Sequence, residues 1–294
     1  MKAAAVSVIG RPSAGKSTLV NTITGMKVSI TSPTPQTTRN KIRGIYTDQR
    51  GQLIFTDTPG FHLSEKEINK RMQEETVSSL SDSDMILYIL DGKRKPGKEE
   101  ETIASLVRKA GVPIVAVLNK ADILTDEEKK EGLEYLRSAF PSSEVLAASG
   151  KLDEGVDEIL ISLFRLAPEG ELLYDENTYT DQDLEFRISE IIREKTIANL
   201  SDEMPHVIYV EIEDLEYDSE NSHVWIRASI NTEREGQKGI IVGRGGENIK
   251  RIRKESFSDI KKIFPGMKLT LDLRVKSAPG WRKNSRTLDR IFKS

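Results

Sequence analysis

Residues 10–17 read Gly10-Arg11-Pro12-Ser13-Ala14-Gly15-Lys16-Ser17, which matches the pattern GxxxxGK[ST]. An apolar run at residues 3–9 precedes them and a helix-length run at residues 16–24 follows, so the stretch is expected to join a strand to a helix. In that context backbone N–H groups surround phosphates, Lys16 neutralises phosphate charge and the Ser17 hydroxyl ligates Mg²⁺. An ordinary glycine-rich turn is the alternative, but average composition gives the pattern by chance only roughly once in a hundred chains of this length. We therefore predict a phosphate-binding loop lined by Gly10, Ser13, Ala14, Gly15, Lys16, Ser17 and Thr18.

The first half of the chain alternates short apolar runs with helix-length amphipathic stretches. Strands are expected at residues 3–9, 52–56, 85–90, 114–118 and 144–147, and helices at residues 16–24, 69–80, 99–110, 126–140 and 156–166. This alternation predicts a mostly parallel sheet with helices on both faces, a doubly wound α/β domain over residues 1–167. Pro168-Glu169-Gly170 ends the last helix, and residues 168–181 are expected to form a linker.

Two further motifs follow expected strands. Asp57-Thr58-Pro59-Gly60 comes after residues 52–56, and Asn119-Lys120-Ala121-Asp122 comes after residues 114–118. Because open α/β sheets bind ligands at the carboxyl ends of strands, we expect Asp57 to hold Mg²⁺ through water and the Gly60 N–H to contact the γ-phosphate. Taken alone, the first tetrapeptide is a common turn and the second a capped helix start. Their order behind a phosphate-binding loop favours the functional interpretation.

The last of these motifs selects the base. A carboxylate at Asp122 can accept hydrogen bonds from both the N1–H and the exocyclic amine of guanine, whereas adenine would leave it unpaired. Asn119, Lys120 and Asp122 are therefore expected to form a base site, and the nucleotide is expected to be GTP rather than ATP.

The three motifs in this order resemble those of the P-loop GTPases. Between the first two, Gln36-Thr37-Thr38-Arg39 resembles the switch I threonine motif of the bacterial assembly GTPases. By that resemblance Thr38 reaches Mg²⁺ together with Ser17 and Asp57, and the catalytic residues are Lys16, Thr38 and Gly60.

Three positions depart from the GTPase pattern. Phe61 stands where Ras-like proteins carry the glutamine that orients the attacking water, so slow hydrolysis is expected. Ser13 stands where related proteins carry an asparagine that holds potassium, which leaves K⁺ activation open. In Ala148-Ser149-Gly150-Lys151 only Ser149 keeps the family residue and Gly150 replaces an alanine, so Ser149 is placed in the guanine site through a backbone contact rather than a side chain.

The second half of the chain has a different order of helices and strands, and it contains an acidic stretch followed by a basic one. A helix is expected at residues 184–200, strands at 206–213 and 223–231, a basic helix at 247–264 and a final strand at 268–276, which together indicate an α+β unit over residues 182–294. Residues 181–235 carry five Lys/Arg and fifteen Asp/Glu, a net charge of −10, and residues 238–294 carry sixteen and five, a net charge of +11. Such a basic stretch is either a solvated face or a surface for nucleic acid.

A glycine motif favours nucleic acid. Residues 240–252 read Ile240-Ile241-Val242-Gly243-Arg244-Gly245-Gly246-Glu247-Asn248-Ile249-Lys250-Arg251-Ile252, an apolar run, GxxG and a helix with spaced isoleucines, which matches the KH signature for about four unstacked nucleotides. A lone GxxG is usually a turn, but the cations just beyond it favour single-stranded RNA. The expected RNA contacts are Ile241, Val242, Gly243, Arg244, Gly245, Gly246, Ile249, Lys250 and Arg251. Trp281 is expected to be a better candidate for base stacking than Trp225, which falls within an expected strand.

Both halves together resemble the Era family, the KH-domain GTPases of bacterial small-subunit assembly. Segments outside the two sites share the likeness, among them Glu190-Ile191-Ile192-Arg193-Glu194-Lys195 and Glu233-Arg234-Glu235-Gly236-Gln237-Lys238. The resemblance implies a P-loop GTPase with a doubly wound α/β sheet, followed by a smaller α+β type II KH domain. It implies GTP/GDP and Mg²⁺ as cofactors, the single-stranded 3′ end of small-subunit ribosomal RNA and the 30S subunit as partners, and a monomer. It also implies a cytoplasmic protein, and leaves a peripheral contact with the inner membrane open.

Composition narrows the alternatives. The 294 residues are enough for two cores, and the absence of cysteine excludes disulfides, thiolate zinc sites and cysteine nucleophiles. The longest apolar runs are six residues, against the roughly 20 that a membrane-spanning helix needs. An RNA-binding module with a degenerate nucleotide domain is the main rival, and the intact motif residues argue against it. A related double-GTPase assembly factor is excluded by the single GTPase domain and the intact GxxG.

Overall fold

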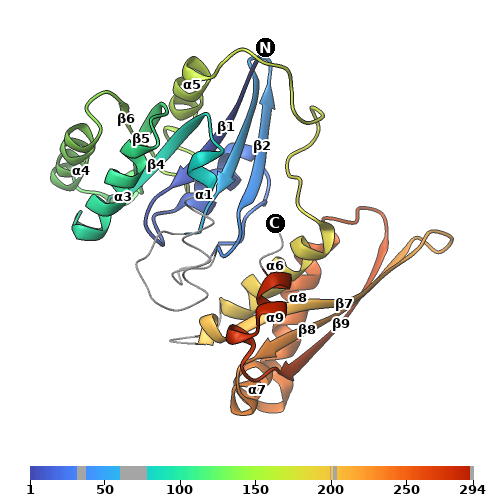
Figure 1. Cartoon of the computed structure of the whole chain (residues 1–294). Helices are drawn as coiled ribbons and strands as arrows, with labels where there is room; N and C mark the ends of the chain where they lie inside the picture. Colours follow the sequence, from blue (N-terminus) through green and yellow to red (C-terminus); the bar gives the residue numbers. More distant parts are fainter. Residues whose placement is uncertain (32–37, 60–77, 199, 201–203, 292–294) are drawn as a thin grey trace. The chain divides into compact units, whose positions relative to one another are not determined.

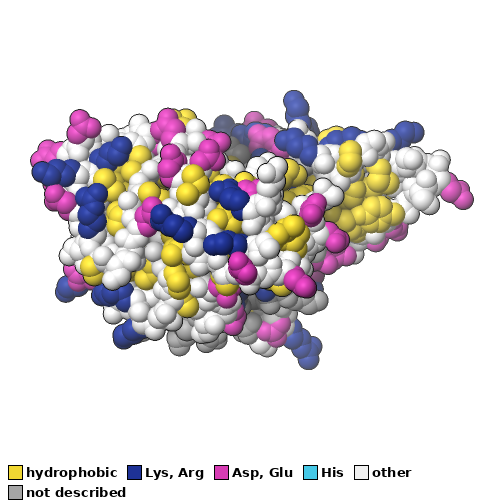
Figure 2. Space-filling model, turned by 90° about the horizontal axis from the view of Figure 1, so that it is seen from above, with side chains coloured by type: hydrophobic (Ala, Val, Ile, Leu, Met, Phe, Trp, Pro, Cys, Tyr) yellow, Lys and Arg dark blue, Asp and Glu magenta, His cyan; other side chains and the backbone are white. Residues whose placement is uncertain are grey.

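The computed structural model describes residues 1–31, 38–59, 78–198, 200 and 204–291. Two compact units divide the chain: the first comprises Met1–Thr31 and Thr38–Asp181, and the second begins at Gln182 (Figure 1). None of the described helices is both long and apolar enough to cross a bilayer. Figure 2 shows a face on which cationic, anionic and hydrophobic side chains are interspersed.

A six-stranded sheet forms the centre of the first unit. Its strands are β1 (Lys2–Ile9), β2 (Ile42–Asp48), β3 (Gly51–Asp57), β4 (Met85–Asp91), β5 (Ile114–Asn119) and β6 (Glu144–Ala147), in the order β2-β3-β1-β4-β5-β6. All neighbours are parallel except β2 and β3. Because β3 and β4 lie on opposite sides of β1, the loop that leaves β1 stands where the strand order reverses, the usual position of a ligand in such sheets.

Helices cover both faces of this sheet. Helices α1 (Lys16–Thr24) and α5 (Val156–Leu166) share one hydrophobic cluster with alternate residues of the strands, and α3 (Lys98–Lys109) and α4 (Asp126–Ala139) share the other. Strand β4 shows the division, since Leu87 and Ile89 belong to the first cluster and Tyr88 and Leu90 to the second. A strand buried on both faces explains the uninterrupted apolar run in the sequence.

Strand β2 was not predicted, and residues 168–181 are held more tightly than a free linker. Strand β2 is an antiparallel edge strand with Arg43 exposed, so its apolar pattern is incomplete. The Tyr179 carbonyl oxygen accepts from the Ile45 N–H at 2.9 Å, and Asp181 pairs with Arg43 at 2.8 Å. Most of the helix predicted at residues 69–80 lies outside the described residues.

The second unit is the predicted α+β arrangement. It contains α6 (Leu184–Ile197), β7 (Ile208–Asp218), β8 (His223–Thr232), α7 (Glu235–Val242), α8 (Glu247–Lys261), β9 (Lys268–Ser277) and α9 (Ser285–Ile291). Strand β8 lies between an antiparallel β7 and a parallel β9, and one cluster joins α6, α7 and α8 to the sheet. The sequence missed α7 and α9, since each has at most eight residues and such helices depend on tertiary packing.

Candidate functional site

The loop of residues 10–17, called the P-loop below, leaves β1 and opens α1. Gly15 has φ +92°, and a Cβ atom at this position would lie 2.3 Å from the Asn119 amide nitrogen, so only glycine fits. Ser13 also lies in the left-handed region, with φ 65°, which is uncommon for a residue with a side chain. The loop is therefore held in a shape set by its neighbours.

Lys16 is buried at the centre of this loop. Its ammonium group donates to the carbonyl oxygens of Gly10 and Arg11, both at 3.0 Å. Burial lowers the pKa of Lys16 from 10.5 to about 8, against the opposing charges of Asp57 and Glu100. A charged group held by two neutral carbonyls in a buried site is well placed to bind an anion.

Three predicted metal ligands from separate segments meet beside the loop. The Ser17 hydroxyl lies 2.9 Å from the Thr38 hydroxyl oxygen and donates to Asp57 Oδ2 at 2.6 Å. Asp57 Oδ1 is buried and finds no hydrogen-bond partner in the part of the chain that the structure describes. Burial raises the pKa of Asp57, and the Lys16 charge and the Ser17 hydroxyl oppose this shift.

This oxygen cluster fits a hard cation. An unsatisfied buried carboxylate oxygen calls for a partner, and Mg²⁺ is bound through one or two carboxylates together with phosphates and water. No group of three or more His, Asp or Glu side chains suited to a metal occurs among the described residues. A cation held at Asp57 would thus depend on hydroxyls and on a phosphate-bearing ligand.

Asn119 connects the P-loop to the other end of the site. Its side-chain amide donates to the Ala14 carbonyl oxygen at 2.8 Å, and its Oδ1 accepts from the Gly150 N–H at 3.1 Å. Lys120 has φ 67° and pairs with the buried Asp91 at 2.8 Å. The half-buried Asp122 lies on the short 3-10 helix Ala121–Ile123 and makes no ion pair with any described residue. Its carboxylate is thus free to accept from a base.

Ser149 is held within the turn that follows β6. Its N–H donates to the Glu154 carbonyl oxygen at 2.8 Å and its hydroxyl accepts from the Leu152 N–H at 3.1 Å, so it closes the turn between β6 and α5. Gly150 packs directly on α1, where an added Cβ would lie 3.0 Å from Leu19 Cα. That close approach favours glycine at position 150.

Sequence reasoning missed two buried acids beside the P-loop, Asp91 and Glu100. Glu100 lies on the same face of α3 as the core residues Ile103, Ala104 and Val107, and this spacing was the available signal. The predicted residues Gly60 and Phe61 lie outside the described residues.

In the second unit, the GxxG loop joins α7 to α8. Gly243 has φ +75°, and a Cβ atom there would lie 2.8 Å from the Asn248 side chain. Asn248 donates to the Ile240 carbonyl oxygen at 3.1 Å and accepts from Arg251 at 3.2 Å, so it ties the loop to both helices. Gly245 and Gly246 also have positive φ values.

An exposed basic surface follows this loop. Arg244, Lys250, Arg251, Arg253 and Lys254 are exposed, and none of them pairs with an acidic side chain in the described part of the chain. Val242, Gly246 and Ile249 are half-buried beside them. The prediction that Ile241 contacts RNA is wrong. Its side chain is 0% exposed and packs from α7 into the core, where it supports the loop but cannot contact RNA.

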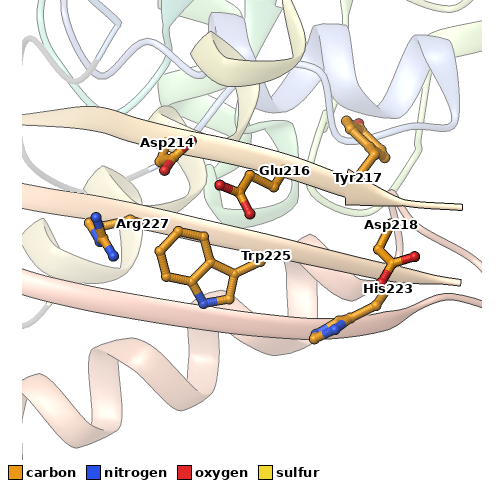
Figure 3. Close-up of a pocket in the computed structure, with 7 residues that line it drawn as sticks. All are labelled: Asp214, Glu216, Tyr217, Asp218, His223, Trp225 and Arg227. Atoms are coloured by element: carbon orange, nitrogen blue, oxygen red, sulfur yellow. The ribbon is translucent and has the colours of Figure 1, made fainter. Parts of the chain in front are cut away.

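The stacking candidate Trp281 is buried, and Trp225 is the more exposed of the two tryptophans. Trp281 is 2% exposed, donates from Nε1 to the Val207 carbonyl oxygen at 3.1 Å and packs on Tyr209 with 5.0 Å between ring centroids, so the stacking prediction is wrong. Trp225 instead lies on the outer face of the sheet, with the Arg227 guanidinium 4.4 Å from its ring centroid (Figure 3). The shallow hollow around it is lined by Asp214, Glu216, Tyr217, Asp218, His223 and Arg227. Its acidic side chains would repel phosphates.

Known proteins match both halves of the chain. A family model described as 50S ribosome-binding GTPase matches residues 5–120, and a KH domain model matches residues 203–281. GTPase Era of Treponema denticola is 45% identical over 294 residues, which cover 99% of each chain. GTPase Era of Borreliella burgdorferi strain ZS7 is 43% identical over 293 residues, 99% of this chain and all of the other. The chain belongs to the Era family of GTPases.

Solved Era structures share the whole fold. A variant of Aquifex aeolicus Era bound to GDP and AlF4⁻ aligns with a TM-score of 0.94 at 31% identity, covering 99% of both chains. Era in complex with MgGDPNP and nucleotides 1506–1542 of 16S ribosomal RNA gives the same TM-score and identity, covering 99% of this chain and 98% of the other. The predicted family, the fold class of a P-loop GTPase followed by a KH domain, and GTP hydrolysis as the activity are confirmed.

Proposed function

We propose that this Era-family GTPase is a nucleotide-controlled switch that binds the single-stranded 3′ end of small-subunit ribosomal RNA and acts in assembly of the 30S subunit. The observation that carries the switch is the contact of Ser17, Thr38 and Asp57, since it brings the end of the P-loop, the expected switch I and the end of β3 to one point. A bound γ-phosphate and cation would stabilise this contact, so the bound nucleotide would control it.

Each predicted residue of the nucleotide site has a proposed role. Backbone N–H groups of Ser13, Ala14, Gly15 and Thr18 would surround the phosphates. The carbonyl oxygens of Gly10 and Arg11 hold the Lys16 ammonium group, which would neutralise phosphate charge. Ser17, Thr38 and Asp57 would hold Mg²⁺, which supplies charge neutralisation at the β- and γ-phosphates. Gly60 stays a predicted γ-phosphate contact.

The guanine end is formed by three residues at and just after the end of β5. Asn119 holds the P-loop against the loop after β6, and Lys120 is fixed by Asp91. The Asp122 carboxylate would accept from the N1–H and the amine of guanine. Ser149 would shape the base pocket from beneath.

The RNA site is proposed on the basic side of the GxxG loop. Gly243, Gly245 and Gly246 would let phosphates approach the backbone, and the cations Arg244, Lys250 and Arg251 would neutralise them. The solved Era complex with a 16S ribosomal RNA segment supports this partner.

Several sequence expectations stay predictions. These are the boundaries of the GTPase domain at 1–167, the linker at 168–181 and the KH domain at 182–294. The monomeric state, the cytoplasmic location, a peripheral contact with the inner membrane and the effect of K⁺ also stay predictions.

The proposal is tested by crosslinking the protein to RNA in cell lysate and sequencing the bound RNA. We expect enrichment of the small-subunit 3′ end, greater with a nonhydrolysable GTP analogue than with GDP. Equal enrichment with both nucleotides would contradict the switch, and recovery of unrelated RNA would contradict the partner.

A further inference from the structure

Three buried side chains connect strand β4, helix α3 and the start of the P-loop. Tyr88 donates its hydroxyl to Glu100 Oε1, and Arg11 Nη1 donates to Glu100 Oε2 at 3.1 Å. Arg11 is 7% exposed, Glu100 1% and Tyr88 0%. Tyr88 and Glu100 lie outside the nucleotide motifs, and Arg11 occupies a variable position of the P-loop motif, so the arrangement of the three side chains needs its own explanation.

Arg11 lies where its position affects Lys16. Its own carbonyl oxygen is one of the two that accept from the Lys16 ammonium group. Its guanidinium also donates to the Lys95 carbonyl oxygen at 3.4 Å, and Arg94 donates to the Pro12 carbonyl oxygen at 3.3 Å. The first turn of the P-loop is thus fixed from α3 and the segment before it.

Glu100 is held from both sides. Burial raises its pKa, and the Tyr88 hydroxyl and the Arg11 guanidinium oppose this shift and favour the charged carboxylate. The ring of Tyr88 is itself fixed by Phe140, with 4.7 Å between centroids. A buried ion pair often adds little net stability compared with apolar residues, so its value here lies in orientation.

We infer that Glu100 is a positioning residue for the nucleotide. Tyr88 orients Glu100, Glu100 orients Arg11, and Arg11 holds the loop carbonyls that aim Lys16 at the phosphates. The inference rests on the proposed nucleotide site. It predicts that a buried tyrosine on β4, which makes no contact with a nucleotide, alters nucleotide affinity.

Tyr88→Phe is the sharpest test, because it removes one hydroxyl and no charge. We expect the Kd for GTP and for GDP to rise about fivefold, measured with fluorescent analogues well below the melting temperature. Phe140→Leu is the matched control, since it loosens the packing of the same ring but leaves the hydrogen bonds in place. It should lower Tm and leave the Kd within about twofold.

A double-mutant cycle tests the link to the loop. Arg11→Gln, Glu100→Gln and the double variant should raise the Kd by similar factors, because losing either partner already breaks the connection. Glu99→Gln is the charge control, since Glu99 contacts Arg11 at 3.3 Å from a more exposed position. It should change the Kd by less than about twofold.

The outcomes separate this inference from the proposed site. If Lys16→Ala binds GTP as the parent does, the nucleotide site itself is misplaced. If Lys16→Ala loses binding while Tyr88→Phe and Glu100→Gln bind like the parent, the positioning role is wrong and the site stands. A Kd for Phe140→Leu that rises as much as that for Tyr88→Phe would also overturn the positioning role, because general loosening would then explain both.

Discussion

Asn119 donates its side-chain amide to the Ala14 carbonyl oxygen at 2.8 Å, so the residue that ends β5 holds the middle of the P-loop. The same side chain accepts from the Gly150 N–H at 3.1 Å. One amide therefore joins the loops after β1, β5 and β6, which sets the distance between the phosphate end and the base end of the proposed site.

Asn119→Ala should break this connection. Loss of a buried hydrogen bond that leaves its partners unsatisfied costs about 1–3 kcal/mol, so we expect a lower Tm and a nucleotide Kd raised by about tenfold or more. Asn231→Ala is the matched control, because Asn231 is also buried and hydrogen-bonded, to Ser229 in the second unit. A Kd unchanged by Asn119→Ala in a calorimetric titration would contradict the role.

Base choice should depend on Asp122. Asp122→Asn replaces an acceptor of two hydrogen bonds with an amide, so GTP affinity should fall by about 100-fold or more. Preference should shift toward xanthosine triphosphate, whose carbonyl at the 2-position suits an amide donor. Competition between the two nucleotides for the parent and the variant measures this shift, and unchanged GTP binding would remove Asp122 from the site.

Lys16 should make the folding stability of the protein depend on pH in the alkaline range. Its pKa is lowered to about 8 in the folded protein and is near 10.5 in the unfolded chain, so between these values the unfolded state binds more protons. Stability contributed through this group therefore rises as pH increases from about 8 to 10.5, by about 3 kcal/mol in total.

The measurement is a difference between the nucleotide-free parent and Lys16→Met. Urea unfolding of both across this pH range cancels the other titrating groups, and the stability of the parent relative to the variant should increase with pH. A constant difference would show that Lys16 keeps its ordinary pKa.

The sequence placed the motifs correctly along the chain because each is a local pattern at the end of a strand. What it could not give is which distant side chains share a site. The pairing of Thr38 with Ser17 was implied only by resemblance, and Glu100 reads as one more acid on a charged helix. The exposure of the tryptophans could not be predicted for the same reason. Trp281 is covered by residues far away in sequence, whereas the strand residue Trp225 faces outward.

Replacing Ser13 with asparagine should make GTP hydrolysis respond to potassium. Parent turnover is expected to be well below the about 5–20 s⁻¹ of an activated Ras-type site. Ser13 has φ 65°, a conformation that asparagine tolerates, so Ser13→Asn should fit the loop without distortion. We expect this variant to hydrolyse GTP at least about tenfold faster in KCl than in NaCl. Equal rates in both salts would show that the loop does not form the cation site, and fast parent turnover in sodium would contradict the expected slow chemistry.

RNA binding should fail without loss of the nucleotide site when the GxxG loop becomes acidic. Arg244→Asp with Gly245→Asp puts two negative charges where phosphates must approach, and Gly245 has φ +57° with open space around it. The matched control is Lys109→Asp with Gly111→Asp, which changes an exposed cation and an open glycine of φ +72° in the first unit. Binding of a 3′-end ribosomal RNA oligonucleotide should collapse only in the first variant, and GTP affinity should survive in it. Lys250→Ala alone should give a graded loss and reduce the log–log salt slope by about 0.7 for each phosphate contact removed. If the first variant binds the oligonucleotide as tightly as the parent, the exposed cations of α8 form a solvated face and the RNA lies elsewhere.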